Sequence, residues 1–436
     1  SSELFVLEEK YAGQSSSEKL RIVRDKMALD SLTVYILSSL ESVMYLYNLR
    51  AHDIDFTPVG LSYSLIYQDR AVIYLQDAAV NEKVRKYLSS LGVEIKSYFE
   101  FYEDIKNLRF ETVGADKQKV NYQTLESLDS SNKVCFVKEY VADMKGVKNK
   151  VEIRNIKKAH LKDAVAMVKF IYYIKTSQDK KSEISVADKL ESFRREQKNF
   201  VDLSFATIAG WAEHGAIVHY EATEETNAEI TNNNFLLVDS GGHYLEGTTD
   251  ITRTIVIGKV SYEMKKNFTL VLKSHIDLAK AKFPEGVTGN QIDMIAREPL
   301  FAHHLNFNHG TGHGVGYLLS VHEGPQNISL SRANNVPLKE GMITSDEPGL
   351  YLTNKYGIRH ENLELTVKDI TNEFGSFLRF EPLTLVPFDL DAILPSYLDE
   401  DEKRYLNNYH ALVYKKVSKY LNEDERKFLK KATRKI

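Results

Sequence analysis

The chain has 436 residues, of which 43% are hydrophobic and 27% are charged, and its formal net charge is −4 at pH 7. This composition is typical of a soluble globular protein of about two to three domains. Because the charge is slightly negative, it gives no electrostatic basis for binding nucleic acid or an anionic membrane, and we expect neither as a partner.

Nothing in the sequence indicates an oxidising or membrane environment. The single cysteine, Cys135, cannot form an internal disulfide. We find no apolar run of about 18 residues that would predict a transmembrane helix, and the first residues have no signal-peptide pattern. We therefore predict a cytoplasmic protein.

The first third of the chain alternates helical and strand-like patterns, which is typical of an α/β domain. We place this domain at residues 1–145, because the stretch that follows, Lys145–Lys150, is charged and contains a glycine. The predicted helices cover residues 17–28, 38–49 and 81–91, and the predicted strands cover residues 31–37 and 71–75.

A second domain is predicted over residues 146–436, where long amphipathic helices are followed by strands. Ser185 is expected to cap one of these helices and Thr288 another. From about residue 376 the chain forms a C-terminal extension. The predicted helices cover residues 156–174, 186–197 and 261–283 and three further segments that begin at Asn290, lie around Leu406 and follow Asn422, and the predicted strands cover residues 235–238, 247–257, 341–343 and 363–367.

Two aspartates flank a predicted turn in the second domain. Asp239 ends a buried apolar run and is followed by Ser-Gly-Gly, and Asp250 comes later in a segment rich in threonine. A turn centred near Tyr244 and Leu245 would place the two carboxylates opposite each other on paired strands. Carboxylates so placed repel unless they share a proton or a cation. The plain alternative is a pair of solvated loop acids.

Two glutamates repeat this arrangement further along the chain. Glu347 lies in Asp-Glu-Pro-Gly, and Glu361 lies in Arg-His-Glu-Asn. A turn centred near Asn354 would again place the two carboxylates opposite each other. His360 is expected to point away from Glu361 and to have a structural role, because neighbouring residues of a strand face opposite sides.

The segment His309–Gly316 contains four glycines, which allow the backbone to approach another group closely. A phosphate-binding loop is a weak alternative, because no Lys-Ser or Lys-Thr follows the glycines. We interpret His313 as a metal ligand and His309 as its neighbour, and His322, in Val-His-Glu-Gly-Pro, adds a third histidine.

Asp239, Asp250, His313, Glu347 and Glu361 together form an oxygen-rich set of four carboxylates and one imidazole. Such a set suits Mn²⁺, can also bind Co²⁺ or Zn²⁺, and lacks the thiolates of structural zinc sites. It is large enough for two divalent metal ions about 3.5–4 Å apart, which can activate water and polarise a carbonyl.

Taken together, the motifs resemble those of the pita-bread metallopeptidases, the family of methionine aminopeptidase, prolidase, creatinase and aminopeptidase P. The order and spacing of the acids and the histidine match, and the resemblance is greatest to cytosolic aminopeptidase P. It implies a creatinase-like N-terminal α/β domain followed by a pita-bread catalytic domain with a curved antiparallel sheet and flanking helices. The segments that carry the resemblance are residues 215–220, 246–250, 309–316, 321–325 and 346–349.

The resemblance also implies which ion each metal ligand would bind. Asp250 and Glu361 would bridge the two ions. Asp239 would complete the shell of one ion, and His313 and Glu347 would serve the other. Glu347 would also act as the general base.

Five further roles follow from the same resemblance. His219 and His322 would stabilise the scissile carbonyl and shuttle protons. His309, Tyr351 and Arg359 would line the proline side of the substrate pocket. The reaction implied is removal of the N-terminal residue from a peptide with proline in the second position, by a homodimeric enzyme.

Two alternatives remain open at this point. A prolidase would cut Xaa-Pro dipeptides, although the local motifs and the C-terminal extension favour aminopeptidase P. A non-catalytic pita-bread domain would bind peptides without cutting them, although all five ligand positions are intact here.

Overall fold

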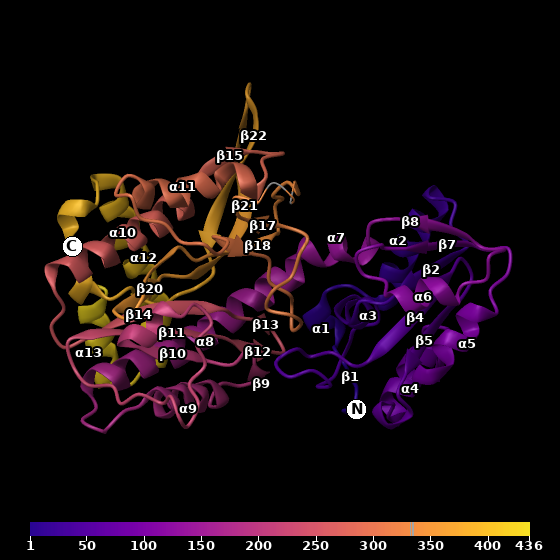
Figure 1. The fold of residues 1–436 in the computed structure, drawn as a ribbon, viewed down its shortest axis with the longest axis horizontal. Helices are drawn as coiled ribbons and strands as arrows, with labels where there is room; N and C mark the ends of the chain where they lie inside the picture. The colour runs from indigo at the N-terminus through magenta and orange to yellow at the C-terminus, as the bar shows by residue number, and fades with distance from the viewer. Residues whose placement is uncertain (332, 334) are drawn as a thin grey trace. The chain divides into compact units, whose positions relative to one another are not determined.

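The computed structural model describes residues 1–331, 333 and 335–436, which form two units. Unit 1 comprises residues 1–153 and 316–320, and unit 2 comprises residues 154–315 and 321–436. The secondary structure of each unit is drawn in Figure 1. None of the helices in the described part of the chain combines the length and the apolar content that a bilayer crossing requires.

Unit 1 is built on a six-stranded mixed sheet in the order β6-β5-β4-β2-β7-β8. Side chains alternate along β2, so that Val34 packs in one apolar cluster and Tyr35 in another. The predicted α/β class is therefore confirmed. The helices are α1 (Glu9–Ala12), α2 (Ser16–Leu29), α3 (Leu40–Leu46), α4 (Glu82–Ser90), α5 (Phe101–Lys106), α6 (Tyr122–Ser127) and α7 (Tyr140–Gly146). The strands are β1 (Phe5–Val6), β2 (Val34–Leu37), β3 (Leu49–Arg50), β4 (Ser62–Tyr67), β5 (Ala71–Leu75), β6 (Val93–Ser97), β7 (Thr112–Ala115) and β8 (Lys133–Phe136).

Residues 316–320 are tied into unit 1 by a buried arginine. Arg50 donates from Nε to the carbonyl of Leu318 at 2.5 Å and from Nη2 to the carbonyl of Tyr317 at 2.9 Å. Leu319 is buried among the apolar side chains of the same unit. A segment distant in sequence thus completes the core of unit 1.

Unit 2 consists of curved antiparallel sheets with helices, and every strand pairing described in it is antiparallel. An isolated bridge between Thr252 and Glu361 joins the three-stranded sheet β10-β11-β14 to the segment that leads into the four-stranded sheet β15-β22-β21-β18. This is the predicted pita-bread architecture. The helices are α8 (Lys150–Thr176, which begins in unit 1), α9 (Glu183–Arg195), α10 (Tyr262–Ala279), α11 (Gly289–Phe301), α12 (Glu400–Val417) and α13 (Glu423–Ala432). The strands are β9 (Phe200–Leu203), β10 (Ile208–Trp211), β11 (Asn234–Ser240), β12 (Gly242–Tyr244), β13 (Gly247–Thr248), β14 (Ile251–Ile257), β15 (Lys282–Pro284), β16 (Gly312–His313), β17 (Asn327–Ile328), β18 (Ile343–Asp346), β19 (Gly349–Leu352), β20 (Tyr356–Arg359), β21 (Asn362–Asn372) and β22 (Gly375–Pro382).

The predicted helix boundaries in unit 2 are wrong at the start of α9 and at the end of α10, among others. The N-cap of α9 is Ser182, whose side chain accepts from the backbone of Ser185, so the cap lies three residues before the predicted Ser185 cap. Helix α10 ends at Ala279, because the residues that follow pair as β15 with β22. The predicted Thr288 cap of α11 is confirmed.

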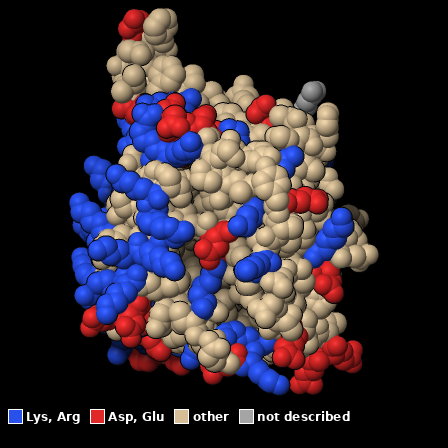
Figure 2. All heavy atoms as spheres, turned by 90° about the vertical axis from the view of Figure 1, so that its left-hand side faces the viewer, with Lys and Arg blue, Asp and Glu red and all other residues tan. Residues whose placement is uncertain are grey.

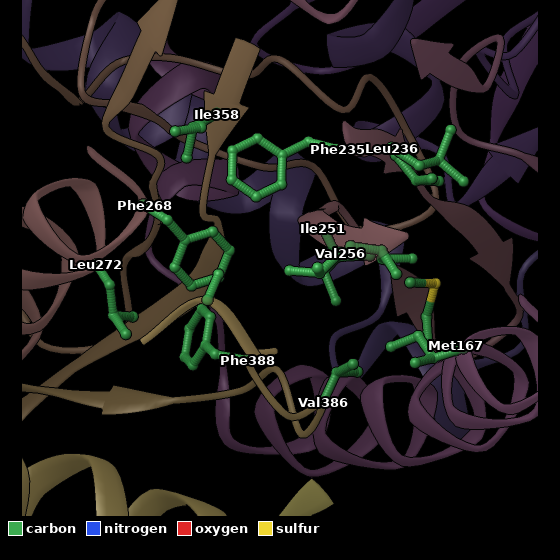
Figure 3. Close-up of a cluster of buried hydrophobic side chains, with 14 of the residues drawn as sticks. Met167, Phe235, Leu236, Ile251, Val256, Phe268, Leu272, Ile358, Val386 and Phe388 are labelled. Atoms are coloured by element: carbon green, nitrogen blue, oxygen red, sulfur yellow. The ribbon is translucent and has the colours of Figure 1, made fainter. Parts of the chain in front are cut away.

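The main core of unit 2 lies between the β11–β14 sheet and the surrounding helices (Figure 3). Leu236 and Val238 contribute to this core, whereas Leu237 packs on the other side with Ile208 and Tyr220. Because side chains alternate along a strand, Asp239 shares the face of Leu237 and points away from the main core. The core therefore directs this carboxylate toward the opposite side of the sheet.

The C-terminal lysines form a solvated helix face. Lys427, Lys430 and Lys431 of α13 are exposed, whereas Leu429 is fully buried in the core. Lys427 forms an ion pair with Glu423 at 2.7 Å. Figure 2, which views the side of the molecule on which α13 lies, shows Lys and Arg side chains gathered toward one edge with acidic side chains among and below them.

A buried histidine of α12 is expected to make unit 2 sensitive to acid. His410 accepts a hydrogen bond at Nε2 from the backbone N–H of Phe388 at 3.0 Å, and burial lowers its pKa to about 3. In the unfolded chain this imidazole takes up a proton near pH 6.5, so the unfolded state binds more protons as the pH falls and the folded state is destabilised. Between pH 7.5 and pH 5 the loss from this one group is about 2 kcal/mol.

We therefore expect that His410→Gln flattens the pH dependence of the free energy of unfolding over this range. Urea unfolding at pH 7.5 and pH 5 measures it. The exposed His303→Gln variant serves as the control and should keep the wild-type slope. An unchanged slope in His410→Gln would show that this imidazole is already protonated in the folded protein.

Candidate metal centre

The residues predicted to carry the chemistry meet at one cavity in unit 2. Its volume is about 770 Å³. Two of the predicted site residues, Glu361 and Tyr351, do not line this cavity directly. Tyr351 forms hydrogen bonds with His309 and Arg359, which do, and a donor atom of Glu361 lies within 4.8 Å of donor atoms of Asp250 and His313. The predicted site residues that line it are His219, Asp239, Asp250, His309, His313, His322, Glu347 and Arg359.

The first acid pair is offset from the predicted register. Asp239 pairs with Thr252, so Asp250 lies two positions from the residue directly opposite Asp239. The difference arises at the turn, where Tyr244 pairs with Gly247 and the two residues between them form the loop. An offset of two residues keeps both carboxylates on the same face of the sheet, as diagonal neighbours.

The second acid pair has the predicted register. Gly349 pairs with Arg359 on one side, and Asp346 pairs with Asn362 on the other, which places Glu347 opposite Glu361. The turn between β19 and β20 is centred on Asn354, whose φ of 60° is in the left-handed region that asparagine tolerates.

His360 points away from the acids and is buried between aromatic rings, as expected. Its ring centroid lies 4.3 Å from that of Phe268 and 5.7 Å from that of Phe388. Burial lowers its pKa well below the ordinary value, and its Nε2 lies 3.2 Å from the carbonyl oxygen of Phe268. A neutral imidazole that packs in the core is a structural residue.

The glycine-rich loop orients His313 toward the acids. The Nδ1–H of His313 donates to the carbonyl of Gly314 at 2.8 Å, which leaves Nε2 free to act as a ligand. This Nε2 lies 3.3 Å from Asp250 Oδ2 and 3.3 Å from Glu347 Oε1. The loop passes so close to β18 that a Cβ on Gly312 would lie 1.9 Å from the carbonyl oxygen of Ser345. Only glycine fits there.

The buried carboxylates of this site would be stabilised by bound cations. Asp239 Oδ1 and Glu361 Oε1 are buried and accept no hydrogen bond from the described residues. Burial and the neighbouring carboxylates raise the pKa values of Asp250 and Glu361 well above the ordinary range, and burial also raises that of Glu347. One donor atom each from Asp250, His313 and Glu361 lies within 4.8 Å of the others. The donor set therefore fits divalent cations.

Three hydrogen bonds hold the acids in place, and two of their donors were missed by sequence reasoning. Thr252 Oγ1 donates to Glu361 Oε2 at 2.8 Å, and Ser345 Oγ donates to Glu347 Oε1 at 3.0 Å. Such outer partners orient metal ligands. A strand threonine or serine carries no distinguishing signal in the sequence, so only the register of the sheets reveals these two. The third donor is Arg359, whose Nη2 lies 2.7 Å from Asp239 Oδ2.

Arg359 also begins a chain of hydrogen bonds along the cavity wall. Its Nη1 donates to the hydroxyl of Tyr351 at 2.8 Å, and that hydroxyl donates to His309 Nε2 at 2.7 Å. The Nδ1–H of His309 donates to the carbonyl of Gly310. Burial lowers the pKa of His309 to about 4, so its imidazole is neutral at pH 7 and can accept the hydrogen bond from the Tyr351 hydroxyl.

His322 and His219 complete the lining of the cavity. The ring of His322 meets that of His313 edge-on, with centroids 4.2 Å apart. Desolvation and the neighbouring His313 lower the pKa of His322 to about 4, so it is neutral at pH 7. His219 is exposed on the loop that follows β10 and η3 (Ala212–Ala216).

A buried glutamate, which the sequence pattern does not reveal, anchors this loop. The Glu183 carboxylate is fully buried and accepts from the backbone of Trp211 and from Tyr220 OH, at 2.8 and 2.7 Å. It also accepts from the backbone of Ala228 at 3.0 Å and lies 2.8 Å from His214 Nδ1. These contacts fix the loop on both sides of His219. An acid in the first turn of a helix is ordinarily solvated, so its role is invisible in the sequence.

Comparisons with known families cover most of the chain. Residues 154–368 match the model described as metallopeptidase family M24. Residues 1–152 match the creatinase/prolidase N-terminal domain, and residues 376–436 match the C-terminal region of M24 peptidases.

Individual relatives agree with these matches. The chain is 37% identical over 430 residues to Xaa-Pro aminopeptidase 1 of Dictyostelium discoideum, an alignment that spans 95% of this chain and 67% of that protein. It is 34% identical to the crystal structure of an X-prolyl aminopeptidase from Caenorhabditis elegans, described as a cytosolic enzyme with a di-nuclear active site. That match has a TM-score of 0.95 and covers 100% of this chain and 73% of the other.

A prolidase from Pyrococcus horikoshii OT3 is more distant, at 25% identity and a TM-score of 0.67, over 86% of this chain and 99% of that one. The full-length similarity to Xaa-Pro aminopeptidases and the three consecutive domain matches agree with the resemblance drawn from the sequence motifs. The chain belongs to metallopeptidase family M24.

Proposed function

We propose that this chain is a dinuclear metal-dependent aminopeptidase that removes the N-terminal residue from peptides with proline in the second position. One observation carries the proposal, namely that four carboxylates and one imidazole converge on one cavity with buried oxygens that lack protein donors. The names of the similar proteins from Dictyostelium discoideum and Caenorhabditis elegans support the Xaa-Pro specificity.

Two divalent ions, which we propose to be Mn²⁺ with Co²⁺ or Zn²⁺ as substitutes, would be held by five residues. When bound they would supply Lewis-acid activation of water and of the scissile carbonyl. Asp250 and Glu361 are proposed to bridge them. The full set of proposed ligands is Asp239, Asp250, His313, Glu347 and Glu361.

The chain's own residues are proposed to move the protons. Glu347 takes the proton of the attacking water at a carboxylate oxygen, and the raised pKa of this buried group favours that transfer. His322 and His219, which line the same cavity, are proposed to donate hydrogen bonds to the scissile carbonyl and to pass the proton to the leaving amine.

Substrate selection is assigned to the wall formed by His309, Tyr351 and Arg359. In their hydrogen-bonded chain, His309 Nε2 already accepts from the Tyr351 hydroxyl, so this nitrogen is not free to accept from an amide N–H. Proline has no N–H and a fixed φ, so a rigid wall of this kind fits its ring.

A metal-dependent assay tests the proposal. The metal-free chain should be inactive, and Mn²⁺, Co²⁺ or Zn²⁺ should restore cleavage of Arg-Pro-Pro after the arginine. Faster cleavage of the dipeptide Arg-Pro than of Arg-Pro-Pro would identify a prolidase instead. No cleavage with any of the three metals would leave the non-catalytic peptide-binding alternative.

The oligomeric state and the location in the cell belong to the same proposal. The family resemblance supports a homodimer, which light scattering would detect as a mass near twice the 49.9 kDa of the chain. The description of the similar Caenorhabditis elegans enzyme as cytosolic supports a cytoplasmic location, which cell fractionation tests.

Replacing His322 with alanine is expected to lower kcat about 100-fold or more, which is the usual contribution of a general acid or base. The metal content should stay unchanged, because His322 is not among the proposed ligands. His304→Ala, at an exposed position outside the cavity lining, is the control. Loss of metal in His322→Ala would show that His322 is a ligand and does not shuttle protons.

A further inference from the structure

The β18–β21 pair carries a second set of polar side chains, on the face that points away from the proposed catalytic ligands. Side chains alternate along a strand, so Asp346 and Glu364 lie on the opposite face from Glu347 and Glu361. Thr344 pairs directly with Glu364. Polar strand faces usually meet water, yet Asp346 and Glu364 are each only 1% exposed.

Many polar atoms on this buried face have no hydrogen-bond partner among the described residues. They include both carboxylate oxygens of Asp346 and both of Glu364. His275 of α10 is fully buried beside them, and its Nδ1 lies 3.2 Å from Asp346 Oδ2 and 3.0 Å from the Asp346 carbonyl. The other unpartnered atoms of this region are His275 Nε2, Thr344 Oγ1, Thr366 Oγ1, Asn362 Nδ2 and Tyr405 OH.

The spacing of these groups fits one shared ligand. One donor atom each from His275, Asp346 and Glu364 lies within 4.8 Å of the other two. Neither carboxylate accepts a hydrogen bond from the other. Tyr405 of α12 is close enough that burial and the Glu364 and Asp346 carboxylates raise its pKa well above the ordinary value.

Asp346 has the His275 imidazole beside it, and Glu364 accepts no hydrogen bond from the described residues. Two buried carboxylates so placed are strongly destabilising unless something neutralises them. Burial and the nearby Asp346 raise the pKa of Glu364 well above the ordinary value. Protonation alone would turn each acid into a donor that still needs an acceptor. A divalent cation cancels both charges and satisfies the oxygens at once. One imidazole nitrogen with two carboxylates is a donor set for Mn²⁺ or Zn²⁺.

We propose that His275, Asp346 and Glu364 hold a third divalent cation, in a buried site separate from the proposed catalytic pair. The Thr366 hydroxyl lies on the same strand face, and the buried Tyr405 hydroxyl of α12 interacts with both carboxylates. Both hydroxyls are available to complete the shell of the ion, directly or through water. The ion has a structural role. It fixes the end of β18, and the next residue along the chain is Glu347.

Metal content is the direct test. The full-length chain is loaded with MnCl₂ or ZnCl₂, dialysed against metal-free buffer and measured by mass spectrometry of the elements. We expect three ions in the wild type, two in Glu364→Leu, one in Asp250→Ala and none in the double variant. Glu364→Gln should also lose the third ion. This more conservative variant tests the site even if the leucine variant has a folding defect. Glu340→Leu, at an exposed glutamate, should keep all three.

The outcomes separate this site from the catalytic one. An ion that is retained in Asp250→Ala and lost when Glu364 is also replaced supports the third site even if the proposed peptidase centre fails. Two ions in both the wild type and Glu364→Leu would overturn the third site. A shared proton or a buried water would then satisfy the two acids in place of a cation.

Thermal unfolding gives a second test, because a bound cation and an unneutralised acid pair predict opposite changes in stability when Glu364 is replaced. In the Asp250→Ala background, a chelator should lower the Tm by about 5 °C or more, because removal of a tightly bound ligand destabilises the folded state. The same chelator should have no effect once Glu364 is leucine. A chelator-insensitive Asp250→Ala chain that becomes more stable with Glu364→Leu would overturn the proposal, since that is how an unneutralised buried acid behaves.

Discussion

Replacing Asp250 with alanine is expected to lower kcat/KM on Arg-Pro-Pro by at least about 1,000-fold, equivalent to roughly 4 kcal/mol of transition-state stabilisation. Asp250 is 4% exposed, and its Oδ2 lies 3.3 Å from His313 Nε2. It is one of the two acids proposed to bridge the ions. Its removal leaves three carboxylates and one imidazole around two cations, so both catalytic ions should be lost.

Metal analysis and steady-state kinetics on the same preparation check this result. Asp188→Ala, which removes an exposed aspartate of α9, should keep full activity and metal content. An Asp250→Ala protein that kept its catalytic ions and its full rate would contradict the bridging assignment.

The second large effect is expected at Arg194, in a buried ion pair between α9 and α8. Arg194 is 0% exposed, and its Nε and Nη2 donate to the two oxygens of Asp163 at 2.8 and 3.1 Å. Tyr244 OH donates to Asp163 Oδ1 at 2.9 Å. Because Tyr244 ends β12, the pair anchors the hairpin that joins Asp239 to Asp250.

Arg194→Met leaves the Asp163 carboxylate buried without its cation, so we expect a loss of about 3–5 kcal/mol in the free energy of unfolding. The affinity for the catalytic metals should fall as well, because the acid-bearing hairpin loses its support. Urea unfolding and metal titration measure the two effects.

The double variant Arg194→Met with Asp163→Leu is the matched control. It removes both charges, and we expect it to recover most of the lost stability. If Arg194→Met alone were as stable as the wild type, the buried pair would contribute nothing to the fold. If the double variant stayed as unstable as the single one, packing rather than charge would be the cause.

The proposed metal ligands were recognisable in the sequence because each lies in a short segment with unusual local requirements. Four glycines around His313 indicate a close backbone approach, and that approach is seen where Gly312 meets Ser345. The turn at Asn354 predicted the register of Glu347 and Glu361. The centre of the turn near Tyr244 was predicted one residue too early, which was enough to change the partner of Asp239 from Asp250 to Thr252.

Contacts between distant segments could not be predicted. Glu183 anchors the loop of His219 through four groups that lie 28 to 45 positions further along the chain. The sequence predicts a strand over Leu363–Val367, but only the tertiary structure shows that Glu364 and Thr366 of this strand are buried. Periodicity indicates which residues share a face and not what covers it.

The hairpin of β19 and β20 is pinned by pairing at its base and free at its tip. The Asp346–Asn362 pair holds the alignment of Glu347 with Glu361, while Thr353 and Asn354 at the tip are exposed. A strand rise of about 3.3 Å per residue places the tip roughly 20 Å from the acids. Added residues or a fluorescent reporter at Asn354 should therefore leave the acids aligned, which makes the tip a suitable attachment point for engineering the chain.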